Sequence, residues 1–126
     1  MIFGTGIDML EVSRIRKVMG QDIGFREHIF TSLEIAYCEN LKNKFQNYAA
    51  RFSAKEAFLK ALGTGWRFGI RFADIEVYQD ELGKPFIRLH RKADELARKE
   101  NITGIHLSMS HTREMVVAMV VLEVEG

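Results

Sequence analysis

The hydrophobic positions of this chain fall into short segments that follow either a strand-like or a helix-like period. Five segments predict strands, because they are apolar runs or alternate apolar and polar residues: 2–8, 72–78, 86–89, 105–110 and 115–124. Asp80–Pro85 has the composition of a turn, so the second and third strands should form a hairpin. The last two strands should be joined through residues 111–114.

Other apolar residues recur at helical spacing. Five helices are predicted, over approximately residues 13–20, 25–30, 32–41, 44–62 and 91–100. Thr31-Ser32-Leu33-Glu34 has the spacing of a capping box, which places a helix start at Ser32. Gly20 should end the first helix and Gly63 the longest, because glycine readily adopts the left-handed backbone that follows many helices.

The order of these elements indicates the fold class. Helices dominate the first half and strands the second, which favours an α+β fold with an antiparallel sheet packed against helices. With 126 residues, the chain is expected to form one domain over residues 1–126 and to bury a workable core.

The composition excludes several classes of protein. Hydrophobic residues make up 47% and charged residues 28%, as in ordinary globular proteins, and the formal net charge is +1. A general nucleic-acid binder is therefore not expected, and any anionic partner must meet a local basic patch. The single cysteine, Cys38, allows no internal disulfide framework and fits a reducing cytoplasm. No apolar run approaches the roughly 20 residues that cross a bilayer, so no membrane association is expected.

Glu56 stands out on the predicted helix 44–62. On a helical wheel it falls within a stripe of apolar residues formed by Phe45, Tyr48, Ala49, Phe52 and Leu59. An ionised carboxylate on an apolar face is costly unless it is paired with a cation or bound to a metal. An ion pair with Lys60, one turn later, and a role as a metal ligand both stay open.

Asp8 directly follows the apolar run of the first predicted strand. Gly4 and Gly6 in that run would let other backbone or a ligand approach closely. Taken alone, Asp8 is typical of a turn or helix cap. Together with Glu56, it offers the hard oxygen ligands that Mg²⁺ prefers, and Mg²⁺ completes its shell with water and substrate phosphate.

Basic residues surround Glu56 in the sequence. Arg51, Lys55 and Lys60 lie on or beside its region, and Gly63-Thr64-Gly65 follows directly. Arginine and lysine bind phosphate, and glycine-rich backbone can approach a phosphate closely. A solvated basic face that ends in a glycine cap would explain the same residues. The chain has neither a Walker lysine motif nor a GxGxxG motif.

Ser108-Met109-Ser110-His111-Thr112 is expected at a tight connection or a strand end. Its adjacent serine and histidine suggest a hydrolase, but sequence neighbours rarely form a nucleophile–base pair, and GxSxG is absent. Hydrogen bonds to a phosphate or to a nucleophile are the better interpretation. His106 is expected to be structural.

Three segments resemble the motifs of holo-(acyl-carrier-protein) synthases, the short single-domain branch of the 4′-phosphopantetheinyl transferases. The first is Gly6-Ile7-Asp8 with Glu11 and Arg14-Ile15. The central segment, RFSAKEAFLKALGTG, runs from Arg51 to Gly65 and is the most specific of the three. The third is Leu107-Ser108-Met109-Ser110-His111-Thr112, with an apolar strand after it. The segments stand in the family's order and span nearly the whole chain.

The resemblance implies an α+β fold that assembles as a homotrimer, with coenzyme A in a cleft between subunits. It implies that Asp8 and Glu56 bind magnesium and that Lys60 contacts phosphate. Residues of the coenzyme A cleft would be Arg51, Lys60, Gly63, Thr64, Gly65, Pro85, His111 and Thr112. The segment Phe45–Ala50 lacks charges that some relatives use around the adenosine phosphates, and Lys42 and Lys44 are candidates to replace them.

The resemblance also implies contacts with the acidic acyl carrier protein. Arg14 and its neighbours would face this partner, with Arg26 nearby. Arg16 and Lys17 either extend this basic cluster or form a solvated helix face. Ser53 stands where many relatives have alanine, a change with little expected consequence.

The implied reaction moves 4′-phosphopantetheine from coenzyme A to a carrier serine, in fatty acid biosynthesis, and releases 3′,5′-ADP. Such chemistry depends mainly on positioning and charge stabilisation. Candidates for the base are Asp8, Glu56 acting through a water molecule, and His111. From the residues alone, a metal-dependent nucleotide pyrophosphatase and a non-catalytic nucleotide-binding module stay open.

Overall fold

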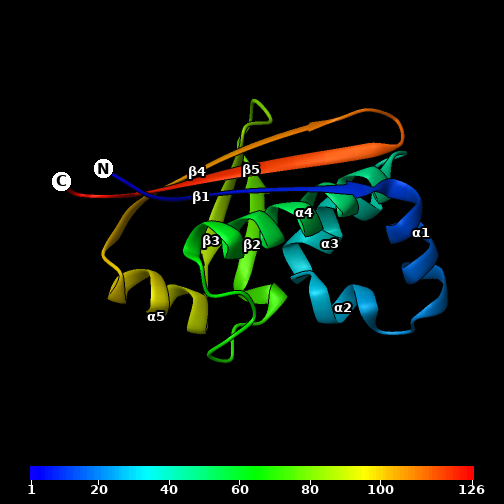
Figure 1. Cartoon of the computed structure of the whole chain (residues 1–126). Helices are drawn as coiled ribbons and strands as arrows, with labels where there is room; N and C mark the ends of the chain where they lie inside the picture. The colour runs from blue at the N-terminus through cyan, green and yellow to red at the C-terminus, as the bar shows by residue number, and fades with distance from the viewer.

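The strands form two antiparallel sheets in the computed structural model, which describes residues 1–126 (Figure 1). The larger sheet contains, in spatial order, β1 (Ile2–Glu11), β5 (Met115–Val124) and β4 (Ile102–His111). The smaller is the predicted hairpin of β2 (Ile75–Gln79) and β3 (Pro85–Leu89). The helices are α1 (Val12–Gln21), α2 (Phe25–Ile29), α3 (Ser32–Glu39), α4 (Lys44–Leu62) and α5 (Arg91–Lys99). The predicted α+β fold is confirmed.

Helix α4 lies across one face of the larger sheet and packs mainly on β1 and β5. The buried residues of β5 that face it are Val116, Ala118, Val120 and Leu122. Gly4 and Gly6 of β1 allow the close approach predicted for them, and the approaching group is the backbone of α4. The main hydrophobic core therefore lies between α4 and the sheet.

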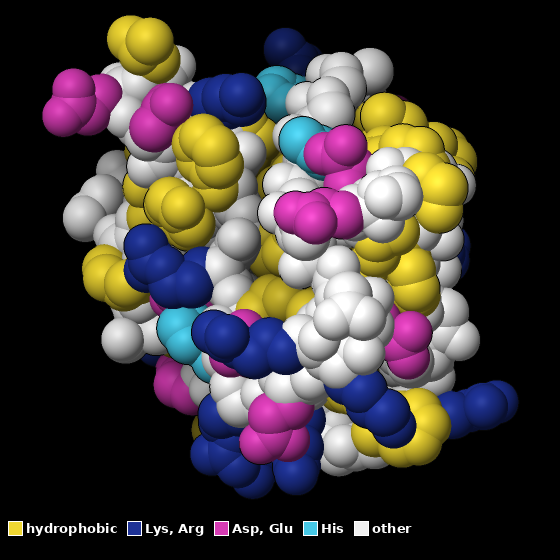
Figure 2. Space-filling model, turned by 90° about the vertical axis from the view of Figure 1, so that its left-hand side faces the viewer, with side chains coloured by type: hydrophobic (Ala, Val, Ile, Leu, Met, Phe, Trp, Pro, Cys, Tyr) yellow, Lys and Arg dark blue, Asp and Glu magenta, His cyan; other side chains and the backbone are white.

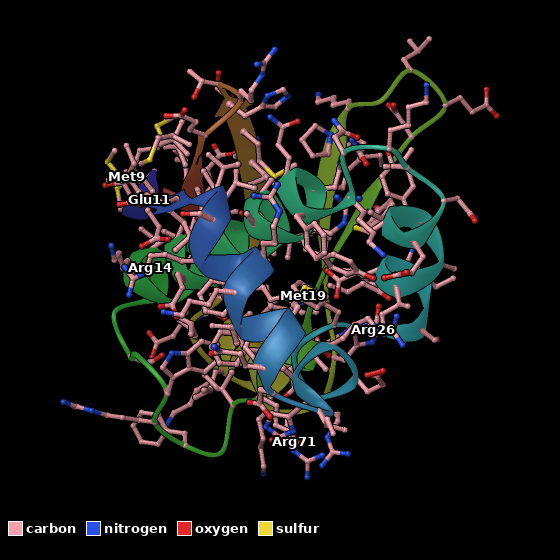
Figure 3. The ribbon with its side chains drawn as sticks, turned by 90° about the vertical axis from the view of Figure 1, so that its right-hand side faces the viewer. Met9, Glu11, Arg14, Met19, Arg26 and Arg71 are labelled. Atoms are coloured by element: carbon pink, nitrogen blue, oxygen red, sulfur yellow. The ribbon has the colours of Figure 1, made fainter.

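The opposite face of the larger sheet carries no covering element. Ile7 and Met9 of β1 and Met119 of β5 project from it and are 60%, 66% and 45% exposed. Ile7 and Met119 are paired in register, so these side chains form one patch. Figure 2 shows hydrophobic side chains along the upper right of its view, and Figure 3 shows Met9 pointing away from the helices. Large apolar patches of this kind mark interaction surfaces.

Helices α1 to α3 pack beside the first half of α4 and enclose a second cluster of buried residues. Ile15 of α1, Phe30 and Cys38 meet Tyr48 and Ala49 of α4 in this cluster. Thr31 caps α3 through the predicted capping box, with Glu34 as the reciprocal partner. The Tyr48 hydroxyl donates a hydrogen bond to Glu39 at 2.6 Å, which ties α4 to the end of α3.

Several element boundaries differ from the predictions. Helix α1 runs to Gln21, so Gly20 lies inside this helix and does not end it. Phe72–Asp74 forms a 3₁₀ turn rather than strand, because Asp74 accepts a hydrogen bond from the backbone N–H of Arg71 and closes the turn locally. Strand β4 begins at Ile102, three residues earlier than predicted, and ends at His111, so Ser108–His111 lies at a strand end, one of the two expected places. Strand β1 continues to Glu11, and α1 follows without a side-chain cap from Ser13.

No helix in the structure is long and apolar enough to cross a membrane.

Candidate active site

Lys60 bridges the end of α4 to strand β1. Its Nζ donates hydrogen bonds to the carbonyl oxygen of Ile7 at 2.9 Å and to Oδ1 of Asp8 at 3.2 Å. Asp8 lies on the α4 side of the sheet, since it alternates with the exposed Ile7 and Met9. The ion pair between Lys60 and Glu56 is therefore not formed, because Lys60 pairs with Asp8 instead.

Glu56 is half-buried on the same side of α4 as Lys60, one turn earlier. Burial raises the pKa of its carboxyl group, and the negative charge of nearby Asp8 raises it further. The Trp66 indole and Lys60 oppose this shift in pKa. Asp8 and Glu56 thus lie close enough for their charges to interact, as the sequence predicts, although they are far apart in the chain.

The turn Gly63-Thr64-Gly65 follows α4 directly. Gly63 and Gly65 have φ values of 83° and 61°, in the left-handed region that favours glycine. A Cβ at either position would have no heavy atom within 4 Å, so this backbone is open to a ligand. The predicted phosphate-compatible turn therefore lies beside Lys60, at the same end of α4.

Arg51 and Lys55 are not part of an exposed basic face. Both are buried, at 1% and 0% exposure, because α3, the hairpin and the sheet enclose this part of α4. A helical wheel cannot show this, since it does not tell which sides of a helix are covered. Of the three basic residues near Glu56, only Lys60 is exposed.

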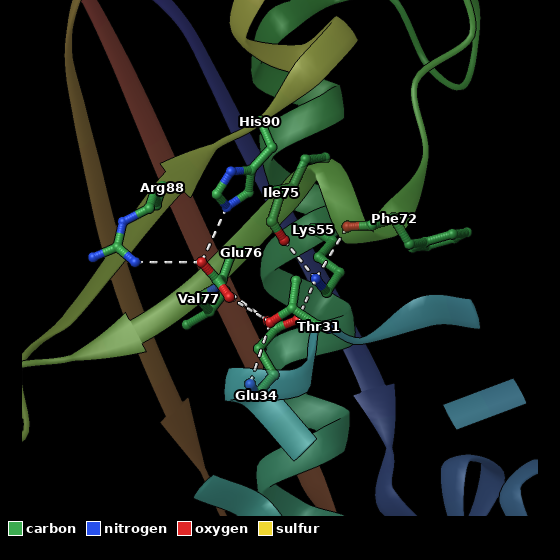
Figure 4. A network of polar contacts seen from close by, with 9 residues as sticks. All are labelled: Thr31, Glu34, Lys55, Phe72, Ile75, Glu76, Val77, Arg88 and His90. Atoms are coloured by element: carbon green, nitrogen blue, oxygen red, sulfur yellow. Dashed lines mark hydrogen bonds and ion pairs between the residues drawn. The ribbon is translucent and has the colours of Figure 1, made fainter. Parts of the chain in front are cut away.

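Lys55 is the centre of a buried polar network (Figure 4). Its Nζ donates hydrogen bonds to Oε1 of Glu34 at 2.9 Å and to the carbonyl oxygen of Phe72 at 3.0 Å, and also to that of Ile75. Glu34 accepts a further hydrogen bond from the backbone N–H of Val77. Burial lowers the pKa of Lys55, and Glu34 opposes this shift. The network joins α3, α4 and the hairpin, so Lys55 stabilises the packing of these elements and is not available to bind a ligand at the surface.

Arg51 lies between α3 and β2. Its Nη2 donates a hydrogen bond to Oε1 of Gln79 at 2.8 Å, and its guanidinium lies over the ring of Tyr37 at 4.5 Å. Its Nε and Nη1 are buried without a hydrogen-bond partner. Arg51 therefore places a buried positive charge next to the Gln79 side chain.

Gln79 lines a cavity of about 200 Å³ near the start of α4. The cavity brings together two of the residues assigned to the coenzyme A cleft, Pro85 and His111. It is lined by Asn43, Gln46, Asn47, Ala50, Gln79, Gly83, Pro85, Met109 and His111. Gln46 also donates a hydrogen bond to the carbonyl oxygen of Thr112 at 2.6 Å, so Thr112 lies beside the cavity.

The sequence analysis did not identify the three polar residues at the start of α4 that line this cavity. Their spacing is a signal that could have found them, because Asn43, Gln46, Asn47 and Ala50 lie at helical intervals on one face. The proposed replacements do not line this cavity. Lys42 is exposed, and Lys44 pairs with Glu39 at 3.3 Å.

The predicted site residues thus form two groups on one chain. Asp8, Glu56, Lys60 and the glycine turn form the first, at the C-terminal half of α4. The cavity with Pro85 and His111 forms the second, near the N-terminus of α4. Asn47 and Glu56 are nine residues apart, about 14 Å along a helix. The cavity lined by Pro85 and His111 contains none of the residues of the first group.

The predicted carrier-facing arginines both lie at the α1–α2 end of the molecule. Figure 3 shows Arg14 and Arg26 on either side of α1, with Met19 between them. Arg14 is exposed and makes no ion pair, whereas Arg26 pairs with Glu27 at 2.9 Å and with Glu39 at 3.1 Å. Arg14 is therefore the freer of the two positive charges.

The family model described as the 4′-phosphopantetheinyl transferase superfamily matches residues 4–118. The chain belongs to this superfamily. A holo-[acyl-carrier-protein] synthase of Geobacter sp. (strain M21) is 51% identical over 125 residues, 98% of this chain and 99% of the relative. The resemblance of the three sequence segments is confirmed.

Solved structures show that this 4′-phosphopantetheinyl transferase shares the fold of its relatives over nearly its whole length. The holo-[acyl-carrier-protein] synthase of Neisseria meningitidis superposes with a TM-score of 0.89 at 35% identity, covering 98% of this chain and 99% of its own. The holo-(acyl-carrier-protein) synthase of Bacillus anthracis, solved in complex with CoA (3′,5′-ADP), gives a TM-score of 0.83 at 39% identity, covering 99% of each chain.

Proposed function

We propose that this 4′-phosphopantetheinyl transferase moves the 4′-phosphopantetheine group of coenzyme A onto a serine of apo-acyl carrier protein and releases 3′,5′-ADP. The observation that carries the proposal is the group formed by Asp8, Glu56 and Lys60 beside the open Gly63–Gly65 backbone. The names of the relatives and the complex of one of them with CoA support the same donor and acceptor. In this proposal the holo-acyl carrier protein is used for fatty acid biosynthesis in the cytoplasm.

Asp8 and Glu56 are the residues that would hold Mg²⁺. Two nearby carboxylates, one of them half-buried without an ion pair, fit a small hard cation that keeps most of its ligands as water and phosphate. When bound, the cation would supply positive charge to the pyrophosphate of coenzyme A. The two carboxylates would otherwise repel each other, which is consistent with the raised pKa of Glu56.

Lys60 would stabilise charge on the transferred phosphate. Its two contacts, with the Ile7 carbonyl and Asp8, fix the ammonium group at the mouth of the site, and the side chain is still exposed to a ligand. The backbone of the turn Gly63-Thr64-Gly65 would approach the pyrophosphate, where a side chain would stand in the way. The carrier serine would attack the β-phosphate while 3′,5′-ADP leaves.

The complete site would form between subunits of a homotrimer. The two groups on one chain are about 14 Å apart along α4, which suits a ligand that reaches from one subunit to the next. The Pro85–His111 cavity, with Thr112 beside it and Arg51 behind it, would bind the nucleotide end of coenzyme A. The uncovered apolar face around Ile7 and Met119 supports assembly through the larger sheet.

Intact-protein mass spectrometry of apo-acyl carrier protein tests the reaction. Incubation with this protein, coenzyme A and Mg²⁺ should add the mass of one phosphopantetheine, and EDTA or Glu56→Gln should abolish the gain. Absence of any gain with a folded sample and several apo-carriers would reject the transferase. Hydrolysis of coenzyme A without transfer would instead indicate a pyrophosphatase.

Light scattering during gel filtration tests the assembly. The wild-type protein should elute with the mass of three chains, and Met119→Glu should dissociate it and abolish transfer. Leu82→Glu, in the exposed turn between β2 and β3, is the matched control and should do neither. A monomeric, fully active wild-type protein would contradict the trimer.

A further inference from the structure

Gln79 is the last residue of strand β2, and its side-chain amide is oriented by two partners. Its Oε1 accepts a hydrogen bond from Nη2 of Arg51 at 2.8 Å, and its Nε2 donates one to the carbonyl oxygen of Gly83 at 3.2 Å. A guanidinium group can only donate, and a carbonyl oxygen can only accept. Both partners therefore require the same orientation of the amide, with its NH₂ group toward the turn between β2 and β3.

Arg51 is a rigid anchor for this amide. It is 1% exposed, and its guanidinium lies over the ring of Tyr37 at 4.5 Å. Its Nε and Nη1 have no hydrogen-bond partner, so Gln79 is the acceptor on which its side chain depends. A hydrogen bond from a charged donor polarises the amide that accepts it and strengthens the amide as a donor. Gln79 therefore presents a strengthened donor at the Pro85–His111 cavity, which Arg51 itself does not line.

Gln79 also connects the β2–β3 turn to helix α4. Asp80 organises this turn from within, since its Oδ1 accepts a hydrogen bond from the backbone N–H of Leu82 at 2.9 Å. The hydrogen bond from Gln79 to Gly83 reaches outside the turn, because Arg51 on α4 holds the other end of the amide. Gly83 lines the cavity, so this connection helps to set the position of one cavity wall.

One hydrogen of the Gln79 amide has no partner within the chain. The NH₂ group carries two hydrogens, and Gly83 accepts the one hydrogen bond that this group donates. Gln79 is half-buried and lines the cavity, so the second N–H is available to an acceptor atom of a ligand. No acidic side chain lines this cavity, which favours a ligand whose oxygen atoms carry negative charge.

We propose that Gln79 is a specificity-determining residue, which holds the β2–β3 turn to Arg51 and donates its second amide N–H to the nucleotide end of coenzyme A. The inference deepens the proposed function and rests on it, because that function places a nucleotide in this cavity. Gln79 lies outside the three sequence segments that resemble the family's motifs.

Calorimetric titration with 3′,5′-ADP tests the ligand contact. Gln79→Met has a similar length and no charge but lacks the N–H groups, and it should weaken binding about ten-fold, as expected for one hydrogen bond to a charged group. Gln21→Met, at the exposed end of α1, is the matched control and should bind as the wild type does. Equal affinities of Gln79→Met and wild type, with both folded by circular dichroism, would overturn the inference.

Gln79→Glu distinguishes the donor from a merely structural role. A carboxylate restores an acceptor for Arg51, so stability to denaturant should be at least that of Gln79→Met, but it supplies no N–H. Binding of 3′,5′-ADP should therefore stay weak, and transfer assays should show a raised KM for coenzyme A with kcat unchanged. Recovery of the wild-type affinity and KM in Gln79→Glu would mean that the residue only satisfies Arg51, which would also overturn the inference.

Amide hydrogen exchange followed by NMR tests the connection to the turn, and it needs no ligand. The N–H of Gly83, which donates to the carbonyl oxygen of Asp80 at 3.0 Å, should exchange several-fold faster in Gln79→Met than in the wild type. The N–H of Glu100, at the end of α5, should exchange equally in both proteins. Unchanged exchange at Gly83 would show that Gln79 does not hold the turn.

The wild-type titration separates this inference from the proposed function. If the wild type does not bind 3′,5′-ADP, the nucleotide role of the cavity fails, and the exchange of Gly83 alone decides whether Gln79 holds the turn. If the wild type binds and Gln79→Met binds equally well, the nucleotide role is supported and the role of Gln79 in it fails.

Discussion

A Cβ atom on Gly6 would stand 1.9 Å from the carbonyl oxygen of Ala57, so strand β1 lies directly against the backbone of α4. Asp8 follows two residues later on the same face of the strand, and Glu56 precedes Ala57 on the helix. The separation of the two carboxylates is therefore set by a backbone contact that only glycine permits. The position of Asp8 on β1 relative to Glu56 on α4 therefore depends on the contact between Gly6 and Ala57.

Gly6→Ala should force β1 away from α4 and lower the free energy of unfolding by about 3 kcal/mol or more, as severe overpacking does. Chemical denaturation followed by circular dichroism measures the loss. The control is Gly20→Ala in α1, where a Cβ would meet nothing within 4 Å, and it should raise stability by up to about 1 kcal/mol. A Gly6→Ala protein as stable as the wild type would show that the strand can shift at little cost.

Lys60→Gln should abolish most of the transfer reaction and leave the fold intact, because the Lys60 side chain is 55% exposed and pairs with Asp8 rather than packing in the core. Loss of a preorganised positive charge at a phosphate typically lowers kcat about 10²-fold or more. Steady-state assays with apo-carrier protein give kcat and KM separately, and Lys99→Gln on α5 is the control. Unchanged kcat in the Lys60→Gln protein would exclude this lysine from the phosphate site.

The sequence predicts α4 well because every signal for it is local. Its apolar spacing and the glycine after it are sufficient for the bounds Lys44–Leu62 and for the left-handed Gly63. Burial around the helix is not a local property. Arg51 and Lys55 look like a basic surface in sequence, yet α3 and the hairpin, which are distant in the chain, cover them.

For the candidate site, too, the sequence indicates individual residues but not the contacts between segments that are distant in the chain. Asp8 and Glu56 could be paired in advance only through the family resemblance, because the residues alone left an ion pair for Glu56 and a turn or helix cap for Asp8 open. The packing of Trp66 on Phe72 could not be predicted, because it depends on a loop reversal through four left-handed residues. The separation of Glu56 from His111 also follows from the packing of α4 across the sheet, which no single segment encodes.

Arg14→Ala should raise the KM for acyl carrier protein several-fold and reduce the dependence of that KM on salt, since Arg14 is exposed and unpaired. Arg26→Ala should have a smaller effect, because its charge is already offset by Glu27 and Glu39. Assays over a range of ionic strength compare the two variants. An unchanged carrier KM in Arg14→Ala would remove this residue from the carrier interface.

Glu76 should make stability depend on pH in the acid range. Burial raises the pKa of this carboxyl group, but hydrogen bonds with Thr31 and His90 outweigh burial, so the pKa in the folded state is lowered. The stabilisation is therefore complete above the unfolded-state pKa, and it is lost as the pH falls through the lower folded-state pKa.

Glu76→Gln should accordingly cost about 1–3 kcal/mol near neutral pH and progressively less as the pH falls below about 4. Thermal unfolding from pH 3 to pH 7 measures the difference between variant and wild type. Glu81→Gln, at an exposed turn, should show no such pattern. A difference between Glu76→Gln and wild type that stays constant over this range would contradict a lowered pKa.

The pair of Lys55 and Glu34 provides the most demanding test of the fold, because both side chains have 0% exposure. Lys55→Met leaves Glu34 as an uncompensated buried charge and should cost about 3–5 kcal/mol, and Glu34→Leu should cost a similar amount through Lys55. The double variant removes both charges and should recover much of that loss, since a buried ion pair often contributes little beyond an apolar pair.

A double-mutant cycle from denaturant unfolding of the four proteins measures this coupling. The recovery should be incomplete, because Lys55 also bonds the carbonyl oxygens of Phe72 and Ile75, and Glu34 bonds the N–H of Val77. These three backbone groups would lose their partners in the double variant. Strictly additive losses would mean that the backbone contacts, rather than the ion pair, account for the stabilisation at this point where α3, α4 and the hairpin meet.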